Sequence, residues 1–303
     1  MPWRRTERGN FWRTITVFNI QPSIFLGLVT YPGTRYPESS TENGLLKKLA
    51  KELSLLGNDP IVEIQGRNLA TEQGLTFTQQ DVRDSIHAEL ETESRWRAYL
   101  NPQSNKLGIT LFMALRMIYR RINNRKSKGQ RMLIRLANIE LAHLDLLQQA
   151  LDTNSDWVLI IEDDAQLTDT GGLAAHLLNF IQTQGLREKP KYLNLSQSFS
   201  EKHLKTRSLL SPVARWNQAG EELVHVYSSK KPFTNTVCAI LYRREFLLEL
   251  NIQLSAIPLK PIIPIDWKLN NVILTMVEQG SLGYGDYWTV EPGPIIQGSI
   301  INS

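Results

Sequence analysis

DWVLIIEDDA (residues 156–165) joins a continuous apolar run to three consecutive acids. Residues 157–161 have no polar side chain among them, which is typical of a central strand that is buried on both faces of a sheet. Such a strand delivers Glu162, Asp163 and Asp164 at its carboxyl end. Open α/β sheets bind ligands beyond the carboxyl ends of their strands, so this segment predicts both a fold class and the place of a site.

The surrounding segments support the same fold class. Residues 23–30 are apolar and rich in β-formers, residues 42–56 place leucines at helical spacing, and residues 60–64 indicate a second strand. A strand, a helix and a strand in succession predict a parallel arrangement. Residues 191–195 and 235–242 are further strand candidates, and a short helix is expected at 243–250. We expect one α/β domain with a mostly parallel central sheet flanked by helices.

Two apolar helices are expected in the middle of the chain. Residues 107–122 and 130–150 both have helical periodicity, and we expect both to pack on the sheet. The preceding residues 70–103 are polar and mixed, and helix and loop covering a sheet edge are expected there.

Composition limits the class of protein. The chain has 303 residues, of which 42% are hydrophobic and 21% are charged, as in a globular protein with a sizeable core. Its single cysteine, Cys238, excludes an intramolecular disulfide and a cysteine-rich zinc site. The first 22 residues lack the apolar core of a secretory signal, and no apolar run approaches the length of a membrane-spanning helix. We therefore expect a cytoplasmic protein.

Basic residues gather in two clusters although the net charge is only +4. The first cluster lies in residues 1–22 beside Trp3, Phe11 and Trp12, and this segment is expected to form a basic, aromatic N-terminal arm. The second cluster lies in residues 120–131. Such clusters attract phosphate or anionic lipid, and amphipathic aromatics settle at a lipid interface. We expect peripheral contact with an anionic inner membrane surface, and no nucleic-acid partner because no recognised binding motif is present.

The three acids suit a divalent metal ion. Adjacent carboxylates at the edge of an apolar core repel one another unless a cation neutralises them. Oxygen ligands favour Mg²⁺ or Mn²⁺, which are usually held by one or two carboxylates together with substrate phosphates. Residues i and i+2 of an extended segment point the same way, so Glu162 and Asp164 are expected to bind the metal, while Asp163 turns aside toward the base of a nucleotide or the backbone.

Several ordered segments resemble glycosyltransferase family 25, the lipooligosaccharide and collagen-type enzymes with a GT-A fold. Together they cover about half of the chain, mostly after residue 130. The segments are WVLIIEDDA (157–165), IELAHLDLLQQAL (139–151), YLNLSQS (192–198), TNTVCAILYRREFLLEL (234–250), PIDWKLN (264–270) and EPGPIIQGSI (291–300).

The resemblance implies transfer of a hexose from a nucleoside-diphosphate sugar, expected to be a UDP-sugar, to a hydroxyl of a saccharide or glycoconjugate, as in lipopolysaccharide biosynthesis. It places the metal on Glu162 and Asp164. It makes Asp266 the general base of an inverting reaction or an acceptor ligand, although Asp is also a favoured helix N-cap. Asn235 and Thr236 correspond to residues lining the donor pocket.

Other correspondences leave alternatives open. Arg35 is the only counterpart of a family turn after the first strand, and we expect it to contact the donor. His143 matches a histidine frequent in the family, or is a packed, hydrogen-bonded residue of its helix. Tyr287 and Trp288 either stack on the sugar or base, or pack within the fold.

The domain is expected to span residues 23–303, with a donor-nucleotide half at 23–165 and an acceptor half at 166–303. Two other functions stay open. A metal-dependent phosphohydrolase or nucleotidyltransferase would need further carboxylates on two metal ions. Asp152, Asp156 and Asp169 are nearby in sequence, but only Asp169 is expected on the same side of the strand end. A non-enzymatic protein of a membrane surface or of nucleic acid would depend on the basic clusters.

Overall fold

The structure is a computed structural model that describes most of the chain. The described residues are 22–32, 34–41, 44–100, 111, 114–116, 118, 119, 122, 127–167, 172–184, 191–196, 210–217, 223–229, 237–283, 286–291 and 294–297. The expected N-terminal arm lies outside them, except for its last residue. Within the described part, no helix combines the length and the apolarity needed to cross a membrane.

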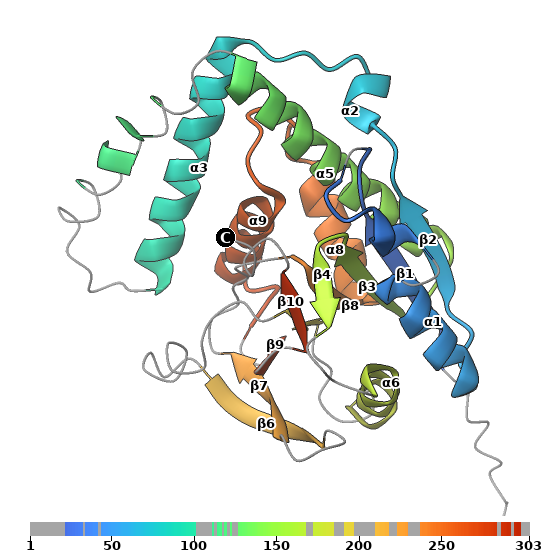
Figure 1. The fold of residues 1–303 in the computed structure, drawn as a ribbon. Helices are drawn as coiled ribbons and strands as arrows, with labels where there is room; N and C mark the ends of the chain where they lie inside the picture. Colours follow the sequence, from blue (N-terminus) through green and yellow to red (C-terminus); the bar gives the residue numbers. More distant parts are fainter. Residues whose placement is uncertain are drawn as a thin grey trace, which may run out of the picture.

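A central sheet of eight strands in the order β2-β1-β3-β8-β5-β9-β7-β6 organises the fold (Figure 1). A second, two-stranded sheet pairs β4 with β10. The strands are β1 Ile24–Val29, β2 Ile61–Gln65, β3 Trp157–Glu162, β4 Ala165–Leu167, β5 Tyr192–Asn194, β6 Leu210–Asn217, β7 Leu223–Ser229, β8 Ala239–Arg243, β9 Tyr287–Glu291 and β10 Ile295–Gln297.

Six of the eight strands run in one direction, and only β8 and β7 run in the other. This confirms the expected α/β class with a mostly parallel sheet. The two reversed strands make several pairings antiparallel, a feature that the apolar patterns alone do not reveal. The helical elements are η1 Pro37–Ser40, α1 Leu45–Leu55, α2 Leu69–Glu72, α3 Gln79–Leu100, α5 Ser127–Asp152, α6 Leu173–Gln184, α8 Arg244–Ser255 and α9 Ile265–Glu278.

Alternation along β3 divides the core between the two faces of the sheet. Trp157, Leu159 and Ile161 pack in a cluster with leucines of α1 and α6. Val158 and Ile160 point to the other face, where they pack with α5, α8 and α9. Because successive side chains of a strand point to opposite faces, Glu162 continues the set that faces α5. The strand therefore determines which helix its first acid meets.

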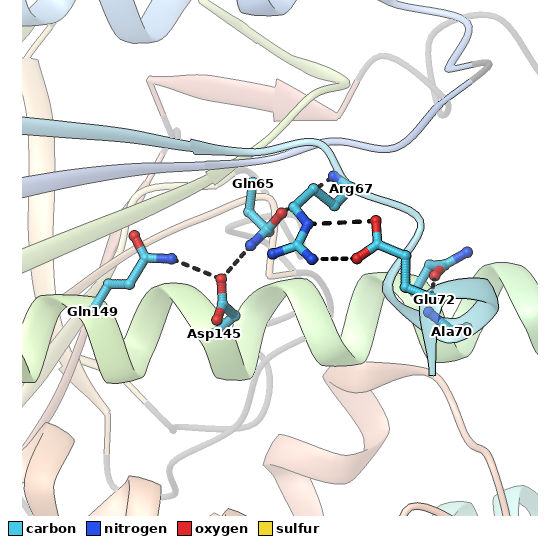
Figure 2. Close-up of polar contacts among 7 residues, drawn as sticks. Gln65, Arg67, Ala70, Glu72, Asp145 and Gln149 are labelled. Carbon is cyan, nitrogen blue, oxygen red and sulfur yellow. Dashed lines mark hydrogen bonds and ion pairs between the residues drawn. The ribbon is translucent and has the colours of Figure 1, made fainter. Parts of the chain in front are cut away.

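Polar contacts hold the end of β2 on helix α5 (Figure 2). The side-chain amides of Gln65 and Gln149 both donate to Asp145 Oδ2. The N–H of Ala70, at the start of α2, donates to Asn138 Oδ1 at 2.7 Å. Buried polar groups are costly without partners, so these bonds fix α5 relative to the edge of the sheet.

The expected packing of residues 107–122 on the sheet is wrong. Leu111, Leu115, Ile118, Tyr119 and Ile122 are all more than half exposed. The described turns of this segment lie on the far side of α3 from the sheet (Figure 1). The face of the sheet that they would have covered is already filled by α5, α8 and α9.

The second expected helix, at 130–150, is confirmed as α5, which packs on β1, β2 and β3. Residues 70–103, expected to mix helix and loop over a sheet edge, contain the long helix α3. It packs on α5 and α9, one layer out from the sheet.

Gly27 in β1 lets α5 approach the sheet closely. A Cβ atom built there would lie 2.7 Å from Ile160 Cδ1 and 3.3 Å from Leu146 Cδ1 of α5. Both neighbours belong to the core cluster of that face, so a larger side chain at this position would have to displace packed groups.

We expect Gly27→Val to lower the free energy of unfolding by about 1–3 kcal/mol, the usual cost of overpacking a core. Urea denaturation followed by circular dichroism measures it. Leu55→Ala, at a side chain that is 78% exposed, is the control and should change stability by less than about 0.5 kcal/mol. A Gly27→Val protein as stable as the wild type would contradict close packing of α5 on β1.

Candidate functional site

A pocket of about 180 Å³ opens beyond the carboxyl end of β3. All three acids at the end of β3 and in the turn after it line the pocket, together with residues of the loop after β1, of α5 and of the start of α9. The lining residues are Val29, Tyr31, Arg135, Leu136, Ile139, Glu162, Asp163, Asp164, Val237, Pro264, Ile265, Asp266 and Gln297. The position matches the ligand-binding edge of open α/β sheets, as the sequence predicted.

Backbone pairing fixes the acids between two neighbouring strands. Glu162 lies opposite Val29 of β1, and its N–H donates to the carbonyl of Cys238 at 2.8 Å. The N–H of Asp163 donates to the carbonyl of Val29 at 3.0 Å. The main chain of the turn is therefore held from both sides, and the side chains start from fixed positions.

Glu162 meets His143 of α5. Nε2 of His143 lies 3.2 Å from Glu162 Oε1, and both side chains are largely buried, with 3% and 15% exposed. His143 is thus a packed, hydrogen-bonded histidine, one of the two alternatives from the sequence. Its partner, however, is an acid of the pocket, so it orients a carboxylate of the candidate site.

Asp163 turns aside toward the loop after β1. Its Oδ2 accepts a hydrogen bond from the hydroxyl of Thr30 at 3.0 Å, and Thr34 of the same loop also hydrogen-bonds to it. Burial raises the pKa of Asp163, and nearby Glu162 adds to the rise, while the two threonines and Arg135 oppose it. Asp163 thus bonds to threonine side chains, not to the backbone as one of the expected alternatives had it, and it still lines the pocket.

Asp164 is 9% exposed and lies beside Cys238, whose Sγ donates weakly to Oδ1 at 3.9 Å. Burial raises the pKa of the Cys238 thiol well above its usual range, and the three nearby carboxylates raise it further. Cys238 therefore stays protonated and packs as a small buried side chain. It is not a reactive thiol, because reactivity depends on the thiolate.

The protein side chains alone do not form a closed metal cage. Among the described residues, no group of three or more His, Cys, Asp or Glu side chains is arranged to hold a metal ion. Mg²⁺ usually needs only one or two carboxylates, with water and substrate phosphates completing the shell. The hard oxygen donors at the pocket fit such a partial ligand set, and they do not fit a zinc site built from nitrogen and sulfur.

No protein-family model and no curated protein matches the chain.

Asp266 reaches the same pocket from α9, far along the chain from the other acids. The N-cap of α9 is Pro264, so the alternative that Asp266 caps the helix is wrong. Burial raises the pKa of Asp266 to about 7, and Glu162 and Glu89 add to the rise. The backbone N–H groups of Trp267 and of Asp266 itself oppose it. A carboxyl with a pKa near neutrality suits proton transfer at physiological pH.

Three of the remaining predicted residues, Arg35, Tyr287 and Trp288, are not among the residues that line the pocket. Arg35 is exposed. Asn235 and Thr236 lie outside the described residues. Tyr287 and Trp288 are 0% and 1% exposed, so of the two alternatives from the sequence they pack within the fold and do not stack on a ligand. Trp288 packs edge to face on Phe180, with 5.7 Å between the ring centroids. Tyr287 packs in the same way on Tyr192, with 4.4 Å between the centroids.

The sequence did not single out Arg135, which lines the pocket from α5. Its Cζ lies over the ring of Tyr31, 5.2 Å from the ring centroid. Arg135, Ile139 and His143 follow one another at intervals of four residues, so they share one face of the helix. That face points to the acids. The sequence shows this spacing, but it does not show which face of α5 meets the pocket.

A buried ion pair connects the two helices of the site. Lys268 of α9 donates to Glu140 of α5, with 5% and 1% of their side chains exposed. Burial raises the pKa of Glu140, while Lys268 and His143 oppose the rise. Because removing one partner would leave an uncompensated buried charge, the pair ties the helix of Asp266 to the helix of His143 and Arg135.

Ionisation of Asp266 should make stability depend on pH. The folded chain binds this proton more tightly than the unfolded chain, since the pKa rises from 3.8 to about 7 on folding. The contribution of Asp266 to the free energy of unfolding therefore falls as pH rises from about 4 to about 7, and is constant above that.

We expect Asp266→Asn, which cannot ionise, to be more stable than the wild type near pH 8, by on the order of 2–4 kcal/mol, and to lose this advantage near pH 4. Urea denaturation at the two pH values measures the difference. Exposed Asp59→Asn is the control and should change little between them. A difference between Asp266→Asn and wild type that is the same at both pH values would contradict the raised pKa of Asp266.

Proposed function

We propose that the chain is a metal-assisted glycosyltransferase with a GT-A fold, related to glycosyltransferase family 25. One observation carries the proposal: a single pocket at the carboxyl end of β3 is lined by three adjacent acids, by Asp266 and by Arg135. These are the groups needed to hold a metal-bound diphosphate and to take a proton from a hydroxyl. The donor is proposed to be a UDP-sugar and the acceptor a saccharide or glycoconjugate hydroxyl.

Asp164 and Glu162 are the proposed ligands of Mn²⁺ or Mg²⁺. The ion would bind the donor diphosphate and stabilise the negative charge that develops on it as the sugar leaves. Asp163 holds the loop after β1 through Thr30, and this keeps Tyr31 at the wall of the pocket. His143 restrains Glu162 through its hydrogen bond to Oε1, as groups bonded to metal ligands commonly do.

Arg135 is proposed to bind the same diphosphate. It is the one Lys or Arg side chain among the described lining residues. A guanidinium offers a planar set of donors that matches phosphate oxygens. Preorganised positive charge beside a leaving phosphate stabilises the transition state more than the ground state. The contact with the ring of Tyr31 restricts Arg135 before the donor binds.

Asp266 is proposed as the general base. With a pKa of about 7, a substantial fraction of Asp266 is ionised at neutral pH and able to accept the proton of the acceptor hydroxyl. A base facing the attacking hydroxyl is the arrangement of a direct displacement, which inverts the anomeric carbon. The Glu140–Lys268 pair fixes α9, so that Asp266 stays near the acids.

The phosphohydrolase and nucleotidyltransferase alternative has less support. It would need further carboxylates near the three acids. Asp156 lies at the amino end of β3, where its carboxylate accepts hydrogen bonds from the N–H and hydroxyl of Ser23. Asp152 is in the last turn of α5 before that same strand end. Both are therefore at the edge of the sheet opposite the pocket, and Asp169 lies outside the described residues.

Calorimetric titration of UDP in the presence of Mn²⁺ tests the donor site. We expect metal-dependent binding in the wild type and a loss of at least about tenfold in affinity in Asp164→Asn, because a charged metal ligand is removed. Asp152→Asn, an exposed acid at the opposite end of β3, is the matched control and should bind as the wild type does. Absence of binding to the wild type with either metal would overturn the UDP assignment.

Arg135→Gln tests the anion contact. We expect it to weaken UDP binding by about tenfold to a hundredfold, in line with loss of charge-assisted hydrogen bonds, and to leave the weaker binding of uridine unchanged. Arg131→Gln, one turn earlier on α5 and outside the pocket lining, is the control. Equal effects of Arg135→Gln on UDP and on uridine would show that Arg135 does not bind phosphate.

A further inference from the structure

Five large apolar side chains form an exposed surface on residues 111–122. Their exposed fractions are 64% for Leu111, 60% for Leu115, 53% for Ile118, 67% for Tyr119 and 55% for Ile122. We call these five residues the apolar stripe. Single exposed hydrophobic residues are ordinary on a protein surface, whereas a contiguous group of this kind marks an interaction site.

The five side chains of the stripe have the spacing of one side of a helix. The described residues from 111 to 122 are helical, and at about 100° per residue the five side chains fall within an arc of about 100°. Arg116 lies off this arc and donates to Glu93, a buried acid of α3. That ion pair anchors the segment to α3, while the five side chains of the stripe stay more than half exposed.

The chain around the stripe is strongly basic. Residues 94–139 contain eleven Lys and Arg residues and no Asp or Glu. Two of the eleven, Arg95 and Arg116, are paired with Glu278 and Glu93. The sequence on the carboxyl side of the stripe, residues 120–131, carries six of the eleven, and among the described ones Arg131 is exposed.

We propose that the apolar stripe binds the surface of an anionic lipid bilayer. A helix with an apolar face and a basic flank lies in the plane of a membrane, with the apolar side chains between the headgroups and the acyl chains. Lys and Arg near an anionic leaflet each add attraction. Tyr119 suits this boundary, because its ring is apolar and its hydroxyl stays in the headgroup layer.

Charge and apolar area together favour an anionic bilayer over a second copy of the chain or a nucleic acid. A second copy of the chain would place two acid-free basic segments against each other, and like charges repel. A nucleic acid would match the charge but would leave five apolar side chains in water. An anionic bilayer matches both the charge and the apolar area. The inference does not depend on the proposed transferase activity.

The segment that carries the apolar stripe leads along the chain into α5, the helix that lines the candidate site. The basic residues lead directly into α5, and Arg135 of α5 lines the pocket. A bilayer bound at the stripe would therefore lie at the end of α5 that carries Arg135, and not at the end that meets the amino edge of β3.

Vesicle flotation of the full chain tests the proposal. With phosphatidylcholine vesicles containing about 30% phosphatidylglycerol, we expect the wild type to float with the vesicles. It should remain at the bottom with pure phosphatidylcholine, or with the anionic vesicles in about 0.5 M NaCl, where charge is screened. The double substitution Leu111→Asn with Leu115→Asn should reduce the vesicle-bound to free ratio by about tenfold or more, because two apolar anchors are lost.

A matched pair of exposed residues serves as the control. Leu248 and Ile252 of α8 have the same four-residue spacing and are 43% and 68% exposed, so Leu248→Asn with Ile252→Asn should float as the wild type does. Wild type that does not float with the anionic vesicles, or stripe and control variants that float equally, would overturn the proposal. Loss of a dimer on size exclusion in the stripe variant, or salt-sensitive binding to DNA without flotation, would assign the surface to another partner and would overturn it as well.

Discussion

The pairing of β3 with β1 on one side and β8 on the other is the constraint on which the candidate site depends. Two backbone hydrogen bonds, from Glu162 to Cys238 and from Asp163 to Val29, hold the turn that carries the acids. Because side chains alternate along a strand, this register directs Glu162 to α5. The neighbouring Asp163 is bound by Thr30 of the loop after β1. A shift of one residue in the register would turn Glu162 to the opposite face of the sheet, and its contact with α5 would be lost.

Helix α5 is the second determinant of the pocket. One of its faces presents Arg135, Ile139 and His143 toward the acids, while Glu140 binds Lys268 of α9. Its close approach to β1 depends on the missing side chain of Gly27, and Gln65 holds it at the edge of the sheet. The carboxyl groups are thereby brought into a partly desolvated space, and burial is the main cause of the raised pKa values of Asp163 and Asp266. The same packing that stabilises the fold thus adjusts the protonation of the site.

The pocket and the apolar stripe lie in different parts of the chain, and different interactions would hold their ligands. The pocket gathers carboxylates and one arginine, a combination suited to a metal-bound diphosphate and a hydroxyl acceptor. The described residues of the apolar stripe lie beyond α3, and the sequence that follows them adds positive charge. The pocket and the stripe are linked through α5, which begins beside the basic residues and continues to the pocket. A transferase organised in this way would act on acceptors presented near a lipid surface.

The sequence by itself determined the local elements and their polarity. The apolar run of β3, the acids at its end and the periodicity of α5 depend on neighbouring residues, so they were predictable. Metal binding by Glu162 and Asp164 stays a prediction from the same segment. Tertiary structure decided which elements meet. It brought Asp266 and Arg135 to the acids, left Arg35 outside, buried Tyr287 and Trp288, and exposed the stripe that was expected to pack on the sheet. The physical reason is that periodicity shows which side of an element is apolar, whereas the partner that covers this side is chosen by strand order and helix packing between distant parts of the chain.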